Sequence, residues 1–117
     1  MKIGFIGLGN VGGKLASSLL RNKFDVTVRD LDSGLVEQFK KLGAKSAETP
    51  KELAEKVELI ITCLPSPEIC LEVMEGSSGV IEGLSENKIW LEMSTTDEHE
   101  VKRIGDKIKK LKAVPLD

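Results

Sequence analysis

Three glycines near the N-terminus, Gly7, Gly9 and Gly12, have the spacing G-x-G-x-x-G. They follow a short apolar run and open a stretch with helical spacing, the context in which this pattern binds a dinucleotide. Gly7 would allow a tight turn, Gly9 a close approach of the backbone to a pyrophosphate, and Gly12 close packing of helix on strand. A purely structural glycine turn is the alternative. The residues expected around the phosphates are Gly7, Leu8, Gly9, Asn10, Val11 and Gly12.

An acidic residue, Asp30, lies 18 positions after Gly12 at the end of the next apolar run. A carboxylate there can accept hydrogen bonds from the ribose hydroxyls of NAD and would repel the 2′-phosphate of NADP. Arg29 could bind that phosphate, but neighbours on a strand point to opposite faces, and the uncharged Leu31 comes next. The pattern therefore predicts NAD as the cofactor, with NADP as the alternative. The other role open to Asp30 is to cap a turn or a helix.

Strand-like and helix-like stretches alternate along the chain. Strands are expected over 2–6, 24–29, 57–64, 88–93 and 113–116, and helices over 10–22, 33–42 and 96–111 and from Pro50 and Pro67 onward. Thr49 and Ser66 are the expected N-caps of the two helices that begin with Pro, and Gly43 is expected to end the second helix. This alternation predicts an α/β fold, with a Rossmann-type, doubly wound, mainly parallel sheet that has helices on both faces.

The composition argues against several classes of function. The net charge is −2, from 17 basic and 19 acidic residues, and the chain has three Phe, one Trp and no Tyr. Nucleic-acid binding would call for a clustered basic excess and aromatic residues for stacking. Neither a membrane-spanning run nor a signal peptide is recognisable. Cys63 and Cys70 match no metal-ligand spacing and are expected to be buried thiols. We therefore expect a cytoplasmic protein with no metal site and with no nucleic-acid or membrane partner.

Four segments together resemble the β-hydroxyacid dehydrogenase family: GFIGLGNVG, CLPSPE, GSSGVIEGL and LEMSTT, in this order and spacing. That family includes 3-hydroxyisobutyrate dehydrogenase, tartronate semialdehyde reductase and, more distantly, 6-phosphogluconate dehydrogenase. The resemblance covers essentially the whole chain. It implies an NAD-dependent oxidoreductase that transfers hydride between nicotinamide and a small 3-hydroxyacid. The chain departs from the family in having Val11 where Met is usual and Glu92 where Asp is usual.

The resemblance also implies contacts on the nicotinamide side of the cofactor. Leu64 and Pro65 correspond to the family's loop beside the nicotinamide, and Thr95 to a residue near the nicotinamide ribose. Ser94 belongs to the same family motif and is expected on the substrate side. The alternatives are that the prolines merely shape a loop and that the hydroxyls cap the last helix.

By the same resemblance, family members continue past the point of Asp117 into a helical domain that carries a catalytic lysine. No residue of this chain matches that lysine, so no catalytic residue is assigned. Residues 1–117 are expected to be the NAD(P)-binding domain alone, without the C-terminal helical catalytic domain. The expected partners are the dinucleotide, a small hydroxyacid for the full-length enzyme, and further copies of the chain. A non-catalytic NAD-binding or assembly module is the alternative function. A pyrroline-5-carboxylate reductase is a third, which the LEMSTT segment argues against.

Overall fold

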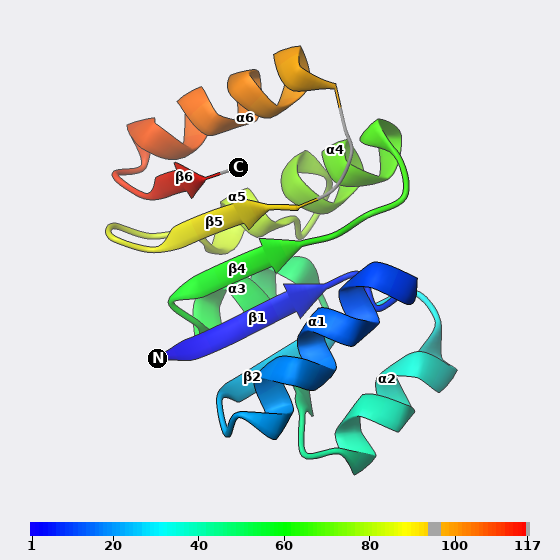
Figure 1. The fold of residues 1–117 in the computed structure, drawn as a ribbon. Helices are drawn as coiled ribbons and strands as arrows, with labels where there is room; N and C mark the ends of the chain where they lie inside the picture. Colours follow the sequence, from blue (N-terminus) through cyan, green and yellow to red (C-terminus); the bar gives the residue numbers. More distant parts are fainter. Residues whose placement is uncertain (94–96, 117) are drawn as a thin grey trace.

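Strand β1 (Lys2–Ile6) lies between β2 (Asp25–Arg29) and β4 (Leu59–Thr62) and is hydrogen-bonded in parallel to both. The computed structural model describes residues 1–93 and 97–116. Within these residues, six strands form one parallel sheet in the order β3-β2-β1-β4-β5-β6 (Figure 1). The chain therefore builds one half of the sheet outward from β1, then returns to the other side of β1 and builds the second half.

The remaining elements alternate with the strands as the sequence predicts. They are α1 (Asn10–Arg21), α2 (Ser33–Lys41), β3 (Lys45–Ser46), α3 (Pro50–Lys56), α4 (Pro67–Glu75), α5 (Val80–Gly83), β5 (Ile89–Glu92), α6 (Glu98–Lys110) and β6 (Val114–Leu116). Two of them, β3 and α5, were not expected. They contain only two and four residues, too few for a hydrophobic period to be recognised.

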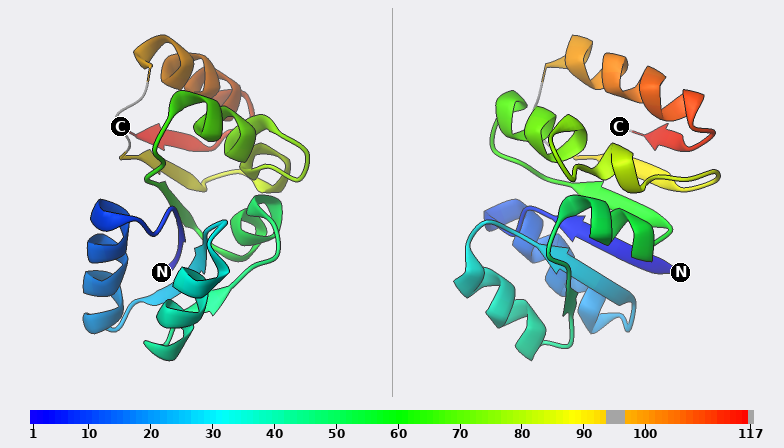
Figure 2. Two further views of the ribbon diagram at one scale, coloured as in Figure 1. Left: turned by 90° about the vertical axis from the view of Figure 1, so that its right-hand side faces the viewer. Right: turned by 180° about the vertical axis from the view of Figure 1, so that it is seen from behind.

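The helices cover both faces of the sheet, which confirms the predicted doubly wound α/β architecture. Helices α1 and α2 pack on one apolar cluster, which includes Phe5 and Val28. Helices α3, α4, α5 and α6 pack on the other, around the fully buried Trp90. In Figures 1 and 2, α1 and α3 accordingly lie on opposite sides of β1. Burial of a side chain such as Phe5 contributes about 1.5–3 kcal/mol to the free energy of unfolding. The two apolar layers therefore hold the strands of the sheet in place.

Most of the helix starts are capped by side chains. Asp32, Thr49, Ser66 and Asp97 each accept a hydrogen bond from a backbone N–H in the first turn of α2, α3, α4 and α6. The expected caps at Thr49 and Ser66 are thus confirmed, as is the left-handed Gly43 after α2, with φ +107°. Helix α1 differs from these four helices, because its N-cap is Gly9 and no side chain caps it.

Several ends of elements differ from the sequence expectation. The predicted strand over 57–64 is confined to Leu59–Thr62, since the chain already leaves the sheet at Cys63 to reach α4. Similarly, the predicted strand over 24–29 begins at Asp25. The last helix begins at Glu98, after its cap Asp97. These shifts leave the order of the elements unchanged.

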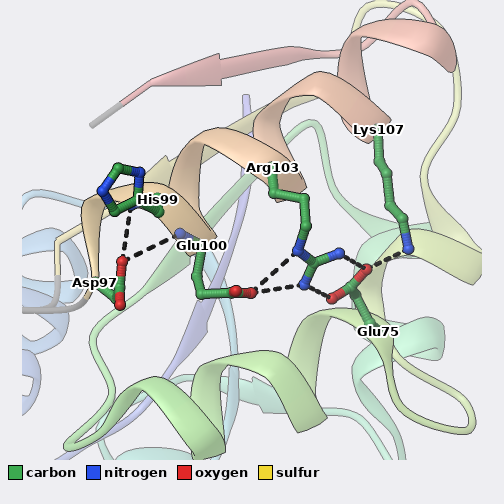
Figure 3. Close-up of polar contacts among 6 residues, drawn as sticks. All are labelled: Glu75, Asp97, His99, Glu100, Arg103 and Lys107. Carbon is green, nitrogen blue, oxygen red and sulfur yellow. Dashed lines mark hydrogen bonds and ion pairs between the residues drawn. The ribbon is translucent and has the colours of Figure 1, made fainter.

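Ion pairs join α4 to α6 on the outside of the second layer (Figure 3). The carboxylate of Glu75, the last residue of α4, accepts hydrogen bonds from the guanidinium of Arg103 and from the ammonium of Lys107. The Nη1–Oε2 distance to Arg103 is 2.9 Å. Glu100 binds the same guanidinium from within α6. This cluster fixes α6 against the end of α4.

Candidate dinucleotide-binding site

The carboxyl ends of β1 and β4 lie side by side, at the point where the strand order reverses. After β1 the chain enters α1 on one face of the sheet, and after β4 it enters α4 on the other (Figure 2). The two loops therefore diverge to opposite faces of the sheet, and doubly wound sheets bind their ligands at such a point of reversal. The predicted site residues of both loops meet at this edge.

Gly7 and Gly12 are required by the close packing of the loop that follows β1. Gly7 has φ +104°, and a Cβ there would lie 2.1 Å from the carbonyl oxygen of Cys63 on the neighbouring strand end. A Cβ on Gly12 would lie 2.1 Å from the carbonyl oxygen of Gly7. The turn and the helix–strand packing predicted for these two glycines are thus both present.

Gly9 differs from Gly7 and Gly12, because no protein atoms pack against the position that its Cβ would take. It is exposed, and a Cβ built on it would meet nothing within 4 Å. It also caps α1 without a side-chain hydrogen bond. The fold itself would accept a methyl group at this position. The bare backbone at Gly9 is therefore suited to a group that approaches from outside, and the start of α1 offers N–H groups and positive dipole charge to an anion.

The other loop residues differ in what they can offer a ligand. Leu8 is 2% exposed, with its side chain in the core and its N–H hydrogen-bonded to Asp30. Only its backbone shape can serve the site. Asn10 and Val11 are exposed at the first turn of α1, and Val11 is 63% exposed. These two side chains border the open space at Gly9.

Asp30, directly after β2, is held by two backbone N–H groups. Its Oδ2 accepts from Leu8 at 2.7 Å, and its Oδ1 accepts from Asp32 at 2.8 Å. The capping role and the predicted ribose role are compatible, because each carboxylate oxygen can accept more than one hydrogen bond. Asp30 therefore ties the glycine loop to the end of β2 and keeps a carboxylate beside it.

Arg29 and Leu31 do not place a cation next to Asp30. The guanidinium of Arg29 donates to the carbonyl oxygens of Ala47, at 3.3 Å, and Glu48, at 2.6 Å. It thus turns toward the segment between β3 and α3, as the strand alternation predicts. Leu31 is 88% exposed and uncharged. Neither side chain is arranged to attract a 2′-phosphate beside Asp30.

Of the four residues predicted to contact the nicotinamide side or the substrate, the structure describes the two on the loop after β4. Leu64 is 9% exposed and belongs to the core, where it packs under the turn at Gly7. Pro65 is exposed at the edge of the sheet. Ser94 and Thr95 lie outside the described residues, so their predicted contacts stay predictions.

A buried polar cluster lies beneath this second loop, and the sequence reasoning missed it. The Nε1–H of Trp90 donates to Oγ1 of Thr62 at 2.9 Å, and the Thr62 hydroxyl and the Cys70 thiol both meet Oε2 of Glu92, at 3.0 and 3.1 Å. Thr62 is 0% and Glu92 5% exposed. The sequence did contain a signal for this cluster: Thr62 and Glu92 are polar residues in two otherwise apolar strands. Glu92 lies two residues after Trp90 and therefore points to the same, buried face of the sheet.

Both cysteines are free thiols; Cys70 is buried as expected, whereas Cys63 is only half-buried, because the chain leaves the sheet at that residue. Burial, together with the hydrogen bond to Glu92, raises the pKa of Cys70 far above its usual range. Burial and the charge of Glu92 also raise the pKa of Cys63. The thiols therefore stay protonated and serve packing and hydrogen bonding. Among residues 1–93 and 97–116, no three His, Cys, Asp or Glu side chains gather as metal ligands.

The strand order, the glycine loop at the start of α1 and Asp30 at the end of β2 define a dinucleotide-binding Rossmann domain. The comparison with protein families agrees with this class. The family model for the NAD-binding domain of 6-phosphogluconate dehydrogenase matches residues 2–117, and the chain belongs to that family of NAD-binding domains.

Similar proteins extend this result. The mouse mitochondrial 3-hydroxyisobutyrate dehydrogenase is 33% identical over 98% of this chain, and the probable Arabidopsis thaliana enzyme of that name is 35% identical over 88%. The alignments cover 34% and 30% of those two proteins, so the chain spans about a third of their length. The structure of 3-hydroxyisobutyrate dehydrogenase from Mycobacterium tuberculosis superimposes with a TM-score of 0.85 at 18% identity, over 97% of this chain and 38% of that one. This last likeness shows the fold.

Proposed function

We propose that residues 1–117 act as the cofactor-binding domain of an NAD-dependent 3-hydroxyacid dehydrogenase or semialdehyde reductase. The family membership and the relatives named as dehydrogenases support this function over a non-catalytic module. The structural observation that carries it is the open backbone at Gly9, at a helix start that no side chain caps.

Each part of the site has a separate task in binding. The glycine loop and the first N–H groups of α1 hold the pyrophosphate, since a Cβ at Gly9 would occupy the space this requires. The carboxylate of Asp30 accepts hydrogen bonds from the adenosine ribose. Leu64 and Pro65 border the nicotinamide, with Thr95 near its ribose and Ser94 toward the substrate. When bound, the nicotinamide gives or takes up the hydride.

The preferred dinucleotide is NAD. Asp30 would repel a 2′-phosphate, and the guanidinium of Arg29 is already hydrogen-bonded to carbonyl groups on the far side of β2. No cation of the described Arg29–Leu31 segment is thus left to compensate that repulsion. NADP binding is expected to be weaker, although it uses the same pyrophosphate contacts.

The substrate of the whole protein is a small 3-hydroxyacid or the corresponding semialdehyde. We assign no catalytic residue within 1–117, because no lysine here matches the family's acid–base residue. Turnover therefore requires the helical domain that the family resemblance implies.

Self-association and a cytoplasmic location complete the proposal. Val114 and Leu116 on β6 are 44% and 49% exposed, and such apolar surface favours contact between copies. Light scattering over a concentration series tests this.

The free thiols of Cys63 and Cys70 support a reducing compartment. No helix among the described residues is long and apolar enough to cross a membrane. Because the mouse and Arabidopsis relatives are named as mitochondrial, fractionation of cells is the test of the compartment.

Calorimetric titration of the chain with NAD and with NADP tests the cofactor proposal. We expect saturable binding of both, with NAD the tighter ligand. Absence of binding by either dinucleotide to the folded chain would contradict the assignment of the site.

A further inference from the structure

The buried carboxyl of Glu92 holds both ends of the loop that follows β4. Thr62, the last residue of that strand, and Cys70, in the first turns of α4, reach the same oxygen, Oε2, at 3.0 and 3.1 Å. The loop of residues 63–66 lies between them. Glu92 itself ends the adjacent strand β5 and is the register partner of Thr62. One side chain thus joins the strand before the loop, the helix after it and the neighbouring strand.

The direction of the hydrogen bonds in this cluster is determined by Trp90. An indole N–H only donates, so Oγ1 of Thr62 must be the acceptor at 2.9 Å. The hydroxyl hydrogen of Thr62 is then available to Glu92, which accepts it. The raised pKa of Cys70 keeps its thiol protonated, so that it too donates to Glu92. The cluster is therefore an ordered chain of donors that ends on Oε2.

Stability alone gives little reason to retain this arrangement. Burying a carboxyl group costs free energy, and well-packed apolar residues often replace buried polar clusters without loss of stability. Thr62, Trp90 and Glu92 have low exposure in the middle of an otherwise apolar cluster. What distinguishes the position is its place at the carboxyl edge of β4 and β5, where Thr62 and Cys70 flank the loop that contains Leu64, and Leu64 lies beside the turn at Gly7.

We infer that Glu92, acting with Thr62 and Cys70, is a positioning residue that sets the loop of residues 63–66 for the nicotinamide half of the dinucleotide. The inference rests on the proposed function, which places Leu64 and Pro65 beside the nicotinamide. It assigns the adenosine half of the ligand to a separate anchor, Asp30 and the glycine loop. The two halves of the dinucleotide should therefore respond differently when the cluster is broken.

The test compares NAD with ADP-ribose, which lacks the nicotinamide ring, by calorimetry on the full chain. Thr62→Val removes the hydroxyl at nearly constant shape, and Thr62→Ser restores it. We expect Thr62→Val to weaken NAD binding by about tenfold, because the loop of residues 63–66 is no longer held in position, and to change ADP-ribose binding by less than about twofold. Thr62→Ser should remain close to the wild type for both ligands. Glu92→Leu, which removes the shared acceptor, provides a second variant with the same expectation.

Two controls separate positioning from general loss of stability. Ile108→Val trims a fully buried side chain of α6 in the same core and should leave the ratio of NAD to ADP-ribose affinity unchanged. Trp90 is the single tryptophan of the chain, so a shift of its emission in Thr62→Val reports that the cluster is broken. An unchanged affinity ratio in Thr62→Val with shifted emission would overturn the inference. So would equal affinities of the wild type for NAD and ADP-ribose. Failure of both ligands to bind the wild type would instead contradict the proposed function itself.

Discussion

The carboxylate of Asp30 accepts the backbone N–H of Leu8 at 2.7 Å, across 22 positions of the sequence. This hydrogen bond connects the acidic residue at the end of β2 to the middle of the glycine loop. The expected ribose acceptor is therefore also part of what holds the glycine loop in place. Changes at Asp30 should affect both the ligand and the loop.

Replacing Asp30 by Ser is expected to lower NAD affinity and to reduce the preference for NAD over NADP. The loss of a charge-assisted hydrogen bond should cost about 1.5–3 kcal/mol of binding free energy. Because the N–H of Leu8 also loses its acceptor, we expect a lower melting temperature. Titration with both dinucleotides and a thermal scan measure the two effects. Tighter binding of NADP than NAD by the wild type would show that Asp30 does not select the cofactor.

Gly9 and Gly12 should respond in opposite ways to the same substitution. Gly9→Ala is expected to leave the fold intact, since a Cβ there meets nothing within 4 Å, and to weaken NAD binding severely. Gly12→Ala should instead destabilise the chain, because its Cβ would lie 2.1 Å from the carbonyl oxygen of Gly7. Calorimetry and thermal unfolding of both variants distinguish the two effects. Unchanged NAD affinity in folded Gly9→Ala would show that the pyrophosphate does not bind against Gly9.

The ion pairs of Glu75 should make stability depend on pH in the acid range. Hydrogen bonding to Arg103, with a further contribution from Lys107, lowers the pKa of Glu75 from 4.5 to about 2. The unfolded chain therefore takes up this proton first, and the contribution of Glu75 should be lost as the pH falls from about 4.5 to 2. Glu75→Gln should make the free energy of unfolding depend less on pH in this range. It should also lower the free energy of unfolding by about 1 kcal/mol near neutral pH, a modest figure because Arg103 and Lys107 are half exposed. Urea unfolding at a series of pH values measures this free energy. If its slope against pH is the same in Glu75→Gln as in the wild type, Glu75 is not the source of the pH dependence.

Residues 1–117 are expected to bind NAD without appreciable dehydrogenase turnover. A positioned general acid or base contributes about 10²–10⁴-fold in rate, and none is assigned here. Exclusion of water and positioning of the hydroxyacid would add further factors. The measurement is NADH absorbance with 3-hydroxyisobutyrate, glycerate and related 3-hydroxyacids. Turnover at ordinary enzyme rates would show that the catalytic groups lie within this chain.

Local patterns in the sequence were sufficient to predict the fold and the turn of the glycine loop. The alternation of apolar periods predicts the parallel sheet, because each period reports which side of an element is buried. The spacing of Gly7, Gly9 and Gly12 predicts the turn, since it depends on backbone sterics within a few residues. The caps at Thr49 and Ser66 are equally local. The short elements β3 and α5 were not predicted, because they contain too few residues to show a hydrophobic period.

The relations that join distant segments were decided only by the tertiary structure. That Asp30 binds the N–H of Leu8, and that Arg29 turns away to the carbonyl groups of Ala47 and Glu48, depends on the register of neighbouring strands. The same holds for Glu92, which the sequence presents only as an acidic residue in an apolar strand. Its partners Thr62 and Cys70 lie 30 and 22 positions away and meet it because β4, β5 and α4 pack at one edge of the sheet. A hydrogen bond needs its two atoms at about 3 Å, and only the packing of these elements brings them to that distance.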